Sequence, residues 1–491
     1  MTHPHKKPLH SISKRSHATS PFFTAKQLAS IYKFPQPNNK PVTVAVLSFG
    51  GGIYGNIDSN GFLTKGDVHK YWSYQNIKTI PKVIVQFFVG ATNDISDIGS
   101  TTENTLDISV IGSCCPSSNV TIILFVFPNT HSLTNAFQTV VDGISVNGIN
   151  YKPSIISVSW GAPEIYYVEN GIDVTGELDG VNTVLKRATE QGINICVASG
   201  DYGATDGNGT NTFSVDFPSS CPYVTSVGGT TLTCPNRVYD NKTKEVVWND
   251  GVRGNFYATG GGISKYFKKP SYQTIGTFRN VPDIALNADP DTGISLYVNN
   301  QLQHGVGGTS MSAPMFAGYL ACFDYKTFVN PILYKNPNCF YDIVLGSNYD
   351  ITQPNQQTQS QQQPLQQKAT LGYDLCSGLG SINGTKLNTI FGLKSPNLVT
   401  SITITPSIST IIKGTTRQYT SVLAPSNATN KKVTWSSSTS SVATIHANGL
   451  VVAVNVGTTI IKCTVNDSRK SYSFPLSVII PAVRNRFKLI F

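Results

Sequence analysis

The sequence is poor in charged side chains and has no apolar segment long enough to cross a membrane. Only 13% of its 491 residues are charged. No run approaches the roughly 18 apolar residues that a spanning helix needs. The first fifteen residues lack the apolar stretch of a secretory signal, so the sequence predicts no export by that route. A low carboxylate count suits a protein that stays folded in acid, because fewer native carboxylates must then take up a proton.

The sequence also lacks the patterns of a nucleic-acid-binding site and of a cysteine metal site. The net charge of +10 is spread over a basic N-terminal tail, scattered lysines and the C-terminus. No basic cluster alternates with aromatic residues, so we interpret the charge as solvated surface and predict no nucleic-acid partner. The nine cysteines form no Cys-x-x-Cys metal pattern, and their odd number leaves at least one thiol free or paired between chains.

The first half of the chain alternates between apolar runs and helical segments. The apolar runs end in glycine or polar turns and cover 42–47, 84–89, 120–127, 155–160 and 193–198. Helical patterns lie between them at 101–111, 133–141 and 180–191. Strand and helix in alternation predict an α/β domain with a mostly parallel sheet covered on both faces.

A glycine-rich turn leads into an apolar helical pattern at Gly307-Gly308-Thr309-Ser310-Met311-Ser312-Ala313-Pro314. The N-terminus of a helix stabilises negative charge that develops at a serine there, and a catalytic serine also needs a base nearby. The alternative is that Thr309, Ser310 and Ser312 are only N-capping residues. The octet resembles the nucleophile motif of two related serine peptidase families, the subtilisins and the sedolisins, which differ in the base.

A histidine base, as in a subtilisin, is not found. Four of the eight histidines lie in the N-terminal tail, and three others lack the following glycine of a His-Gly-Thr motif. His304 precedes Gly305 but lies only six positions before Ser310. The base must therefore be another group.

Carboxyl groups supply two candidate sites at strand ends. Glu103 and Asp107 are four apart, so on a helix both project from one face and are close enough to share a proton. The alternative is a Ser100–Glu103 capping box with Asp107 as a surface acid. Asp201 follows a strand in Ser199-Gly200-Asp201, where it is either a functional acid or a turn-forming residue.

The order Glu-x-x-x-Asp, Ser-Gly-Asp, Gly-Thr-Ser resembles the sedolisins, the serine-carboxyl peptidases, over residues 20–393. The resemblance implies a subtilisin-like fold and a serine endopeptidase acting in acid on peptides or proteins. Ser310 is then the nucleophile, Glu103 the general base, Asp107 its partner and Asp201 a neutral oxyanion-hole donor. A neutral carboxylic acid in that role requires low pH or a raised pKa.

The same resemblance implies further sites. Its substrate-binding walls correspond to these residues: Ser157, Ser159, Trp160, Gly161, Gly260 and Gly261. Structural glycine turns are the alternative for both stretches, 157–161 and 260–262. Where some members carry a glutamate after the first strand, this chain has Ser48.

One calcium ion is also implied by the resemblance. Its ligands would be the Asp342 and Asp374 carboxylates with the backbone carbonyls of Ile343, Thr370 and Gly372, and hard cations prefer such oxygen ligands. Isolated loop aspartates are otherwise turn residues.

Beyond residue 395 the pattern changes to short alternating strands without helices. This pattern at 398–480 resembles a bacterial-type immunoglobulin-like domain and predicts a small β-sandwich. Such a domain tethers an enzyme to a surface or glycan, or acts as a spacer. The remaining segments are a basic tail at 1–19, predicted to be disordered, and a basic tail at 481–491.

Two functional hypotheses follow. The first is an acid-acting serine-carboxyl endopeptidase, working in an acidic compartment or an extracellular milieu. The second is an inactive binding or adhesion protein that uses its C-terminal domain. All four catalytic positions favour the first. The second is favoured because the match begins near residue 20, so the sequence predicts no large pro-segment before it.

Overall fold

A computed structural model divides the chain into two compact units, unit 1 at 1–393 and unit 2 at 394–491. The residues that the structure describes are these: 7–8, 11–12, 22–210, 212–253, 257–323, 325–348, 367–392, 399–426, 428, 431–465 and 470–480. The predicted tail at 481–491 lies outside them. Within the described ranges, no helix is long and apolar enough to cross a membrane.

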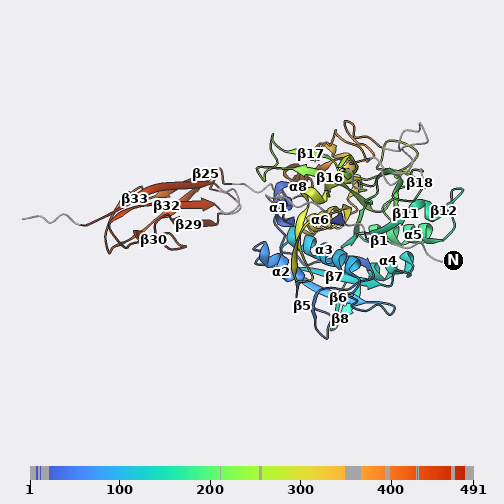
Figure 1. The fold of residues 1–491 in the computed structure, drawn as a ribbon, viewed down its shortest axis with the longest axis horizontal. Helices are drawn as coiled ribbons and strands as arrows, with labels where there is room; N and C mark the ends of the chain where they lie inside the picture. Colours follow the sequence, from blue (N-terminus) through green and yellow to red (C-terminus); the bar gives the residue numbers. More distant parts are fainter. Residues whose placement is uncertain are drawn as a thin grey trace, which may run out of the picture. The chain divides into compact units, whose positions relative to one another are not determined.

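Unit 1 is organised around an eight-stranded sheet (Figure 1). From one edge to the other its strands are β6 (Lys82–Phe87), β7 (Val120–Phe127), β3 (Val42–Phe49), β10 (Ile155–Val158), β14 (Asn194–Ala198), β16 (Thr225–Thr233), and then β20 (Ile284–Asn287) and β17 (Lys244–Val247), both on β16. All pairings are parallel except that of β16 with β17. The predicted mostly parallel sheet is confirmed.

Helices cover both faces of this sheet. They are α1 (Ala25–Ile31), α2 (Asp67–Tyr74), α3 (Ile98–Cys114), α4 (Leu133–Asp142), α5 (Glu177–Glu190), α6 (Thr309–Ala321), α7 (Asn330–Lys335) and α8 (Gly384–Ile390). Side chains alternate across β3: Val44 and Val46 pack into the core beneath α3 and α6, while Ala45 and Leu47 pack into the core beneath α4 and α5. A strand buried on both faces explains its continuous apolar run.

Short strands and turns of 3₁₀ helix complete unit 1. The strands are β4 (Gly55–Ile57), β5 (Leu63–Gly66), β8 (Ile144–Val146), β9 (Ile149–Tyr151), β11 (Trp160–Pro163), β12 (Val168–Glu169), β13 (Ile172–Asp173), β15 (Asp216–Phe217), β18 (Gly262–Lys268), β19 (Phe278–Val281), β21 (Ile294–Val298), β22 (Gln301–Gly307), β23 (Phe340–Tyr341) and β24 (Ser381–Ile382). The 3₁₀ turns are Glu164–Tyr166, Gly203–Thr205, Asp250–Arg253, Pro290–Thr292 and Pro337–Cys339.

Part of the predicted N-terminal tail is ordered. Strand β1 (Lys7–Pro8) pairs with β11, and β2 (Ser11–Ile12) pairs with β22, both antiparallel. The prediction of disorder is wrong for these four residues, because tertiary pairing supplies partners that a polar sequence does not announce. The rest of 1–19 lies outside the described residues.

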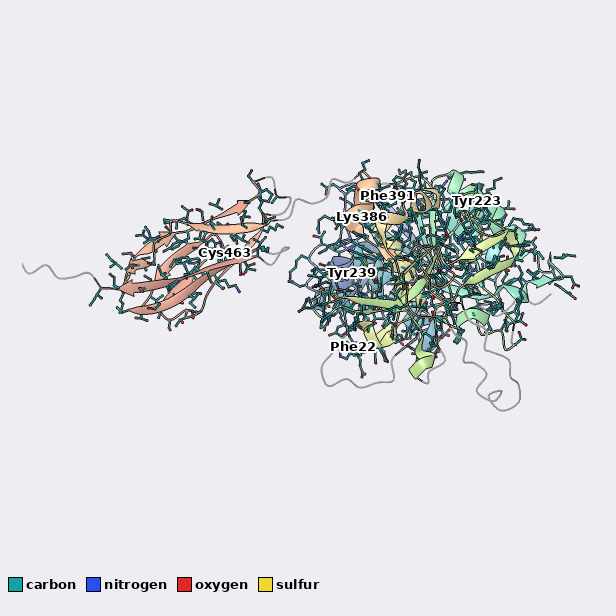
Figure 2. All side chains as sticks on the ribbon, turned by 90° about the horizontal axis from the view of Figure 1, so that it is seen from above. Phe22, Tyr223, Tyr239, Lys386, Phe391 and Cys463 are labelled. Atoms are coloured by element: carbon teal, nitrogen blue, oxygen red, sulfur yellow. The ribbon has the colours of Figure 1, made fainter. Side chains whose placement is uncertain are left out.

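Unit 2 is all β, as its alternating sequence predicts. Its strands are β25 (Ser401–Thr405), β26 (Thr410–Ile412), β27 (Thr416–Gln418), β28 (Thr420–Ala424), β29 (Val433–Ser437), β30 (Ala443–Ile445), β31 (Leu450–Ala453), β32 (Gly457–Val465) and β33 (Ser471–Ile479). They enclose an apolar core that includes Tyr419, Cys463 and Leu476. Figure 2 shows Cys463 on β32 among these strands.

Candidate active site

Ser310 lies in the first turn of α6, directly after a sharp glycine turn. Gly308 has φ +97°, a conformation that suits glycine, and a Cβ on Gly307 would come within 2.3 Å of the Ala288 carbonyl oxygen. The N-cap residue Gly308 offers no side-chain hydrogen bond. Ser312 instead donates from Oγ to the carbonyl of Leu286 at 3.1 Å. The N-capping interpretation of these hydroxyl residues is therefore wrong.

A glutamate contacts the Ser310 hydroxyl. Ser310 Oγ donates to Glu103 Oε2 at 3.0 Å, and both side chains are fully buried. The pair joins α3 to α6, which lie side by side near the centre of unit 1 (Figure 1). Within the described part of the chain, no histidine hydrogen-bonds to Ser310. His304 lies on the preceding strand but pairs through Nδ1 with Ser295 Oγ at 2.8 Å.

Helix α3 begins earlier than the capping-box alternative requires. Asp97 is the N-cap, and its side chain accepts from the Ser100 N–H at 3.1 Å. The Ser100–Glu103 capping box is thus wrong, since both residues lie inside the helix. Asp107, one turn beyond Glu103, is also fully buried and is not a surface acid.

Asp107 is held by Ser159, which lies between β10 and β11. Ser159 Oγ donates to Asp107 Oδ1 at 2.7 Å across fully buried surroundings. Burial raises the pKa of Asp107 well above its ordinary value, the negative charge of Glu103 raises it further, and the Ser159 hydrogen bond opposes both. The carboxyl group therefore favours its protonated form.

Asp201 follows β14 and is fixed by the residue before the serine. Its Oδ1 accepts from the Thr309 N–H at 2.8 Å and from Thr309 Oγ1 at 2.7 Å. Thr309 Oγ1 also accepts from the Gly200 N–H at 3.2 Å. These bonds tie the end of β14 to the start of α6, so Asp201 does more than form a local turn. The three acids named from sequence and Ser310 come together here.

Two further buried acids were missed by sequence reasoning. Asp206 and Asp216 lie in the loop after β14 and on β15, and both are at most 4% exposed. Burial, followed by the neighbouring Asp206 carboxyl, raises the pKa of Asp216 well above its ordinary value. Asp216 also touches β11, because a Cβ on Gly161 would come within 2.1 Å of its Oδ1. No motif spacing marks either acid, so the folded structure alone brings them here.

The residues predicted to form substrate-binding walls lie in two stretches, 157–161 and 260–261. Ser157, Ser159 and Trp160 bury their side chains, and Trp160 packs edge-on against Phe49 at 6.0 Å. Gly161 pairs with Lys7 of β1 through the backbone.

Gly260 and Gly261 allow two close backbone approaches. Cβ atoms at these positions would lie 2.0 Å from the Ser199 carbonyl oxygen and 2.1 Å from that of Leu375. A packing role is therefore sufficient to explain both glycines, and their assignment to a substrate wall stays a prediction.

Ser48 replaces the glutamate of an extended acid network with a neutral contact. Its hydroxyl donates to Asn104 Oδ1, the residue after Glu103, and Asn104 Nδ2 donates to the Gly52 carbonyl at 2.9 Å. The contact between the end of β3 and α3 is thus uncharged at this point.

The residues suggested for calcium converge on one loop. The Gly372 N–H donates to Asp342 Oδ2 at 2.9 Å, and the Thr370 N–H donates to Asp374 Oδ2 at 3.1 Å. In the described ranges, no three His, Cys, Asp or Glu side chains are grouped to hold a metal ion. Asp374 Oδ1 also accepts from the N–H groups of Cys376 and Ser377, at 2.8 and 2.9 Å. The calcium ion therefore stays a prediction.

The fold of unit 1 is subtilisin-like, and a buried serine and buried carboxyl groups lie together in it. Residues 90–327 match the Subtilase family, and residues 398–473 match the Bacterial Ig-like domain (group 2). By the first of these matches and by the relatives described next, unit 1 is similar to the subtilases and to kumamolisin and sedolisin.

Three comparisons support this assignment. Kumamolisin from Bacillus sp. (strain MN-32) is 32% identical over 395 residues, which are 76% of this chain and 64% of that protein. Sedolisin from Pseudomonas sp. (strain 101) is 35% identical over 239 residues, covering 44% of this chain and 38% of that protein. The solved structure of Pseudomonas sedolisin, a serine-carboxyl proteinase complexed with two molecules of pseudo-iodotyrostatin, has a TM-score of 0.59 at 27% identity and covers 76% of this chain and 98% of that chain. The chain thus spans less than two thirds of the length of the two curated relatives.

Proposed function

We propose that unit 1 is an acid-acting serine-carboxyl endopeptidase that hydrolyses peptide bonds in peptides or proteins. The observation that carries the proposal is the buried 3.0 Å hydrogen bond from Ser310 Oγ to Glu103 Oε2. A serine hydroxyl needs a base at this distance to become a nucleophile, and this carboxylate is the base it contacts. The homologous peptidases support the same reaction class.

In this mechanism Ser310 attacks the carbonyl carbon of the substrate while Glu103 accepts its proton. Glu103 then returns the proton to the leaving amine, and a water molecule hydrolyses the acyl-enzyme by the reverse path. Asp107 lies one helical turn away and shares the proton with Glu103. The Ser159 hydroxyl orients Asp107 and thereby the pair.

Asp201 serves as the oxyanion donor. Its Oδ1 already accepts two hydrogen bonds from Thr309, so the proton of a neutral Asp201 belongs on Oδ2. A neutral acid donates to a developing oxyanion, whereas an ionised carboxylate repels it. The proposed activity therefore requires a neutral Asp201 and the proton that burial favours on Asp107 by raising its pKa, so it should fall as pH rises.

Calcium would stabilise the loop that contains Asp342 and Asp374 in this proposal. Binding of one ion would offset the repulsion between the two carboxylates and fix the carbonyls of 370–372. Removal of calcium with a chelator is then expected to lower the melting temperature of unit 1, and an Asp342→Asn variant is expected to lose that response. If the chelator leaves the melting temperature unchanged, the calcium part of the proposal is wrong.

The deciding experiment compares two substitutions at Asp201 with the unsubstituted chain on a denatured protein substrate between about pH 3 and 8. Loss of one oxyanion-hole donor costs about 10²–10³-fold in kcat, which is the expected deficit of Asp201→Ala. Asp201→Asn keeps a neutral donor at every pH, so it should retain more activity and extend it toward neutral pH. Equal pH profiles for the unsubstituted chain and Asp201→Asn would contradict the neutral-acid role.

A binding protein without catalysis is the alternative. Unit 2 favours it only in so far as an immunoglobulin-like domain can recognise a surface or glycan. The absence of hydrolysis at every pH, with calcium present and the fold intact by circular dichroism, would replace the enzyme proposal with this one.

A further inference from the structure

Glu164 is a buried carboxyl group that the proposed mechanism does not use. It follows β11 directly and is 1% exposed. Its Oε2 accepts from Ser264 Oγ at 2.7 Å, and its Oε1 accepts from the Lys265 N–H at 2.6 Å. Burial raises the pKa of Glu164, and these hydrogen bonds oppose that rise. Because a buried carboxylate is costly without donors, the two bonds stabilise it in this position.

One end of this link lies on the side of the proposed active site that holds Asp107. Glu164 is five residues after Ser159, whose Oγ donates to Asp107 Oδ1 at 2.7 Å. Strand β11 occupies the positions between Ser159 and Glu164. The Glu164 N–H donates to the Val215 carbonyl at 2.8 Å, which fixes the backbone at this point. The carboxyl group is therefore anchored to the segment that orients the partner of the proposed base.

The other end of the link lies on the side that holds Asp201. The Ala258 N–H donates to the Asp201 carbonyl at 3.0 Å, and the Gly260 N–H donates to the Gly200 carbonyl at 2.7 Å. Strand β18, which carries Ser264, begins two residues after Gly260. The chain thus runs along the turn that contains Asp201 and continues directly into the strand that Glu164 binds.

The Ser264 hydroxyl is committed to this link. Its Oγ accepts from the Tyr266 N–H at 3.1 Å and from the Phe267 N–H at 2.8 Å. A hydroxyl has one hydrogen to donate, and this one goes to Glu164. A glutamine at this position could accept from only one of the two donors, Ser264 and Lys265, because its amide nitrogen accepts nothing. Glu164→Gln therefore keeps the side-chain volume but weakens the link.

The groups that carry the proposed chemistry are held by other contacts. Ser310 on α6 bonds directly to Glu103 on α3, and Asp201 Oδ1 is fixed by the two bonds from Thr309. These bonds form without Glu164. A change at Glu164 should therefore act on the space between the two segments and leave the arrangement of the reacting groups in place.

We propose that Glu164 is a positioning residue for substrate, which joins β11 to β18 and thereby fixes the spacing between the two stretches predicted as substrate-binding walls, 157–161 and 260–261. The inference rests on the proposed function, because it takes these stretches as the sides of a peptide-binding site. It goes beyond that function by assigning a role to a residue outside both stretches. It also states which kinetic constant the residue controls: a weaker link raises KM and leaves kcat in place.

Kinetics on a denatured protein substrate at acid pH test this role. A misplacement of about 1 Å in groups that position a substrate can cost about 10²-fold, and one of the two bonds remains in Glu164→Gln, so KM should rise about tenfold. The change in kcat should be less than about twofold, which is the signature of lost binding without lost transition-state stabilisation.

The matched control is Glu177→Gln. Glu177 is 3% exposed and accepts from the N–H groups of Leu133 and Thr134 at 3.2 and 2.8 Å, at the start of α4. It is thus a second buried glutamate that accepts hydrogen bonds, and its substitution should leave both KM and kcat unchanged. Melting temperatures of the two variants measure the stability that each has lost and establish that both are folded.

Binding in an inactive background separates this inference from the proposed function. Fluorescein-labelled lysozyme that has been reduced and alkylated, and so stays unfolded, is titrated into the Ser310→Ala chain with and without Glu164→Gln. The Kd should rise about tenfold with Glu164→Gln and stay unchanged with Glu177→Gln. If the unsubstituted chain cuts no protein while this difference in Kd is found, the catalytic proposal fails and the positioning role stands.

Three results would overturn the positioning role. The first is that Glu164→Gln changes KM and Kd no more than Glu177→Gln does. The second is that Glu164→Gln lowers kcat alone, which would place its effect on the chemical step. The third is that the folded Ser310→Ala chain binds no unfolded protein, because the two stretches would then not form a peptide-binding site. Each of these results leaves the hydrolysis measured with the unsubstituted chain as a separate finding.

Discussion

The centre of unit 1 holds ionisable side chains, whereas the core of unit 2 is built from apolar ones. In unit 1, Glu103, Asp107 and Asp201 are at most 1% exposed. Among the described residues of unit 2, Thr459 is the one buried polar side chain. Burying a carboxyl group costs free energy unless partners or protonation compensate, and such buried acids concentrate at functional sites. The difference therefore favours unit 1 as the place of the proposed reaction, whereas the core of unit 2 contributes stability.

The largest expected effect comes from removing the nucleophile. Ser310→Ala should lower kcat by about 10⁴–10⁶-fold, since loss of a nucleophile leaves only binding and oxyanion stabilisation. Thermal unfolding should change little, because one hydroxyl with one hydrogen bond is lost. Ser312→Ala is the matched control on the same helix and should retain activity. A similar loss in both variants would show that the helix, not the nucleophile, is being tested.

A core substitution in unit 2 should do the opposite. Leu476 is fully buried on β33, so Leu476→Ala should cost unit 2 about 2–5 kcal/mol of unfolding free energy. Hydrolysis by unit 1 should stay unchanged. Val456→Ala, at a position 55% exposed, is the control and should change stability by no more than about 0.5 kcal/mol. Loss of hydrolysis in Leu476→Ala would break the separation of roles.

Ser159 sharpens the comparison, because a buried hydroxyl here acts on a catalytic acid. Ser159→Ala should lower kcat by up to about tenfold, because a hydrogen bond of this kind contributes about 0.5–1.5 kcal/mol. The Ser159 bond lowers the pKa of Asp107, so its loss should move the alkaline limb of the pH profile upward. The control is Ser109→Ala, which removes another buried hydroxyl, on α3, and should leave the pH profile unchanged. An unshifted profile in Ser159→Ala would reduce Ser159 to a packing residue.

The smallest effect concerns stability and pH. Asp107 has a raised pKa in the folded state. Its contribution to the free energy of unfolding is therefore fully present below its unfolded pKa of about 3.9 and is lost as pH rises through the folded pKa. Asp107→Asn cannot ionise. Its melting temperature should match that of the unsubstituted chain near pH 3 and exceed it by about 1–3 °C at pH 7. The surface control Glu190→Gln should show no such divergence, and a constant difference across pH would contradict the raised pKa.

Local pattern was sufficient for much of unit 1 and for most of unit 2. The strand at Val120–Phe127 has the predicted bounds, because all eight of its residues are buried and only Thr121 is polar. In unit 2, the strand at Val433–Ser437 was likewise predicted by its alternation. Helix α3 was placed correctly, but its start was placed three residues late, since Ser100 offered a false capping signal.

Contacts distant in sequence were not predictable in this way. Asp216 and Ser159 carry no local signature of their roles, and β1 and β2 form only because β11 and β22 offer them edges. Such contacts join segments up to about three hundred residues apart, and their free energy depends on the whole fold.

The sequence by itself determined the two kinds of unit, the serine turn and the four-residue spacing of Glu103 and Asp107, because periodicity, glycine turns and helical spacing are local properties of the chain. Only the tertiary structure decided that Glu103 meets Ser310, that Ser159 binds Asp107 and that the N-terminal segment lies along two strand edges. Those contacts require the sheet to bring strand ends and helix starts together, and no local pattern encodes that convergence.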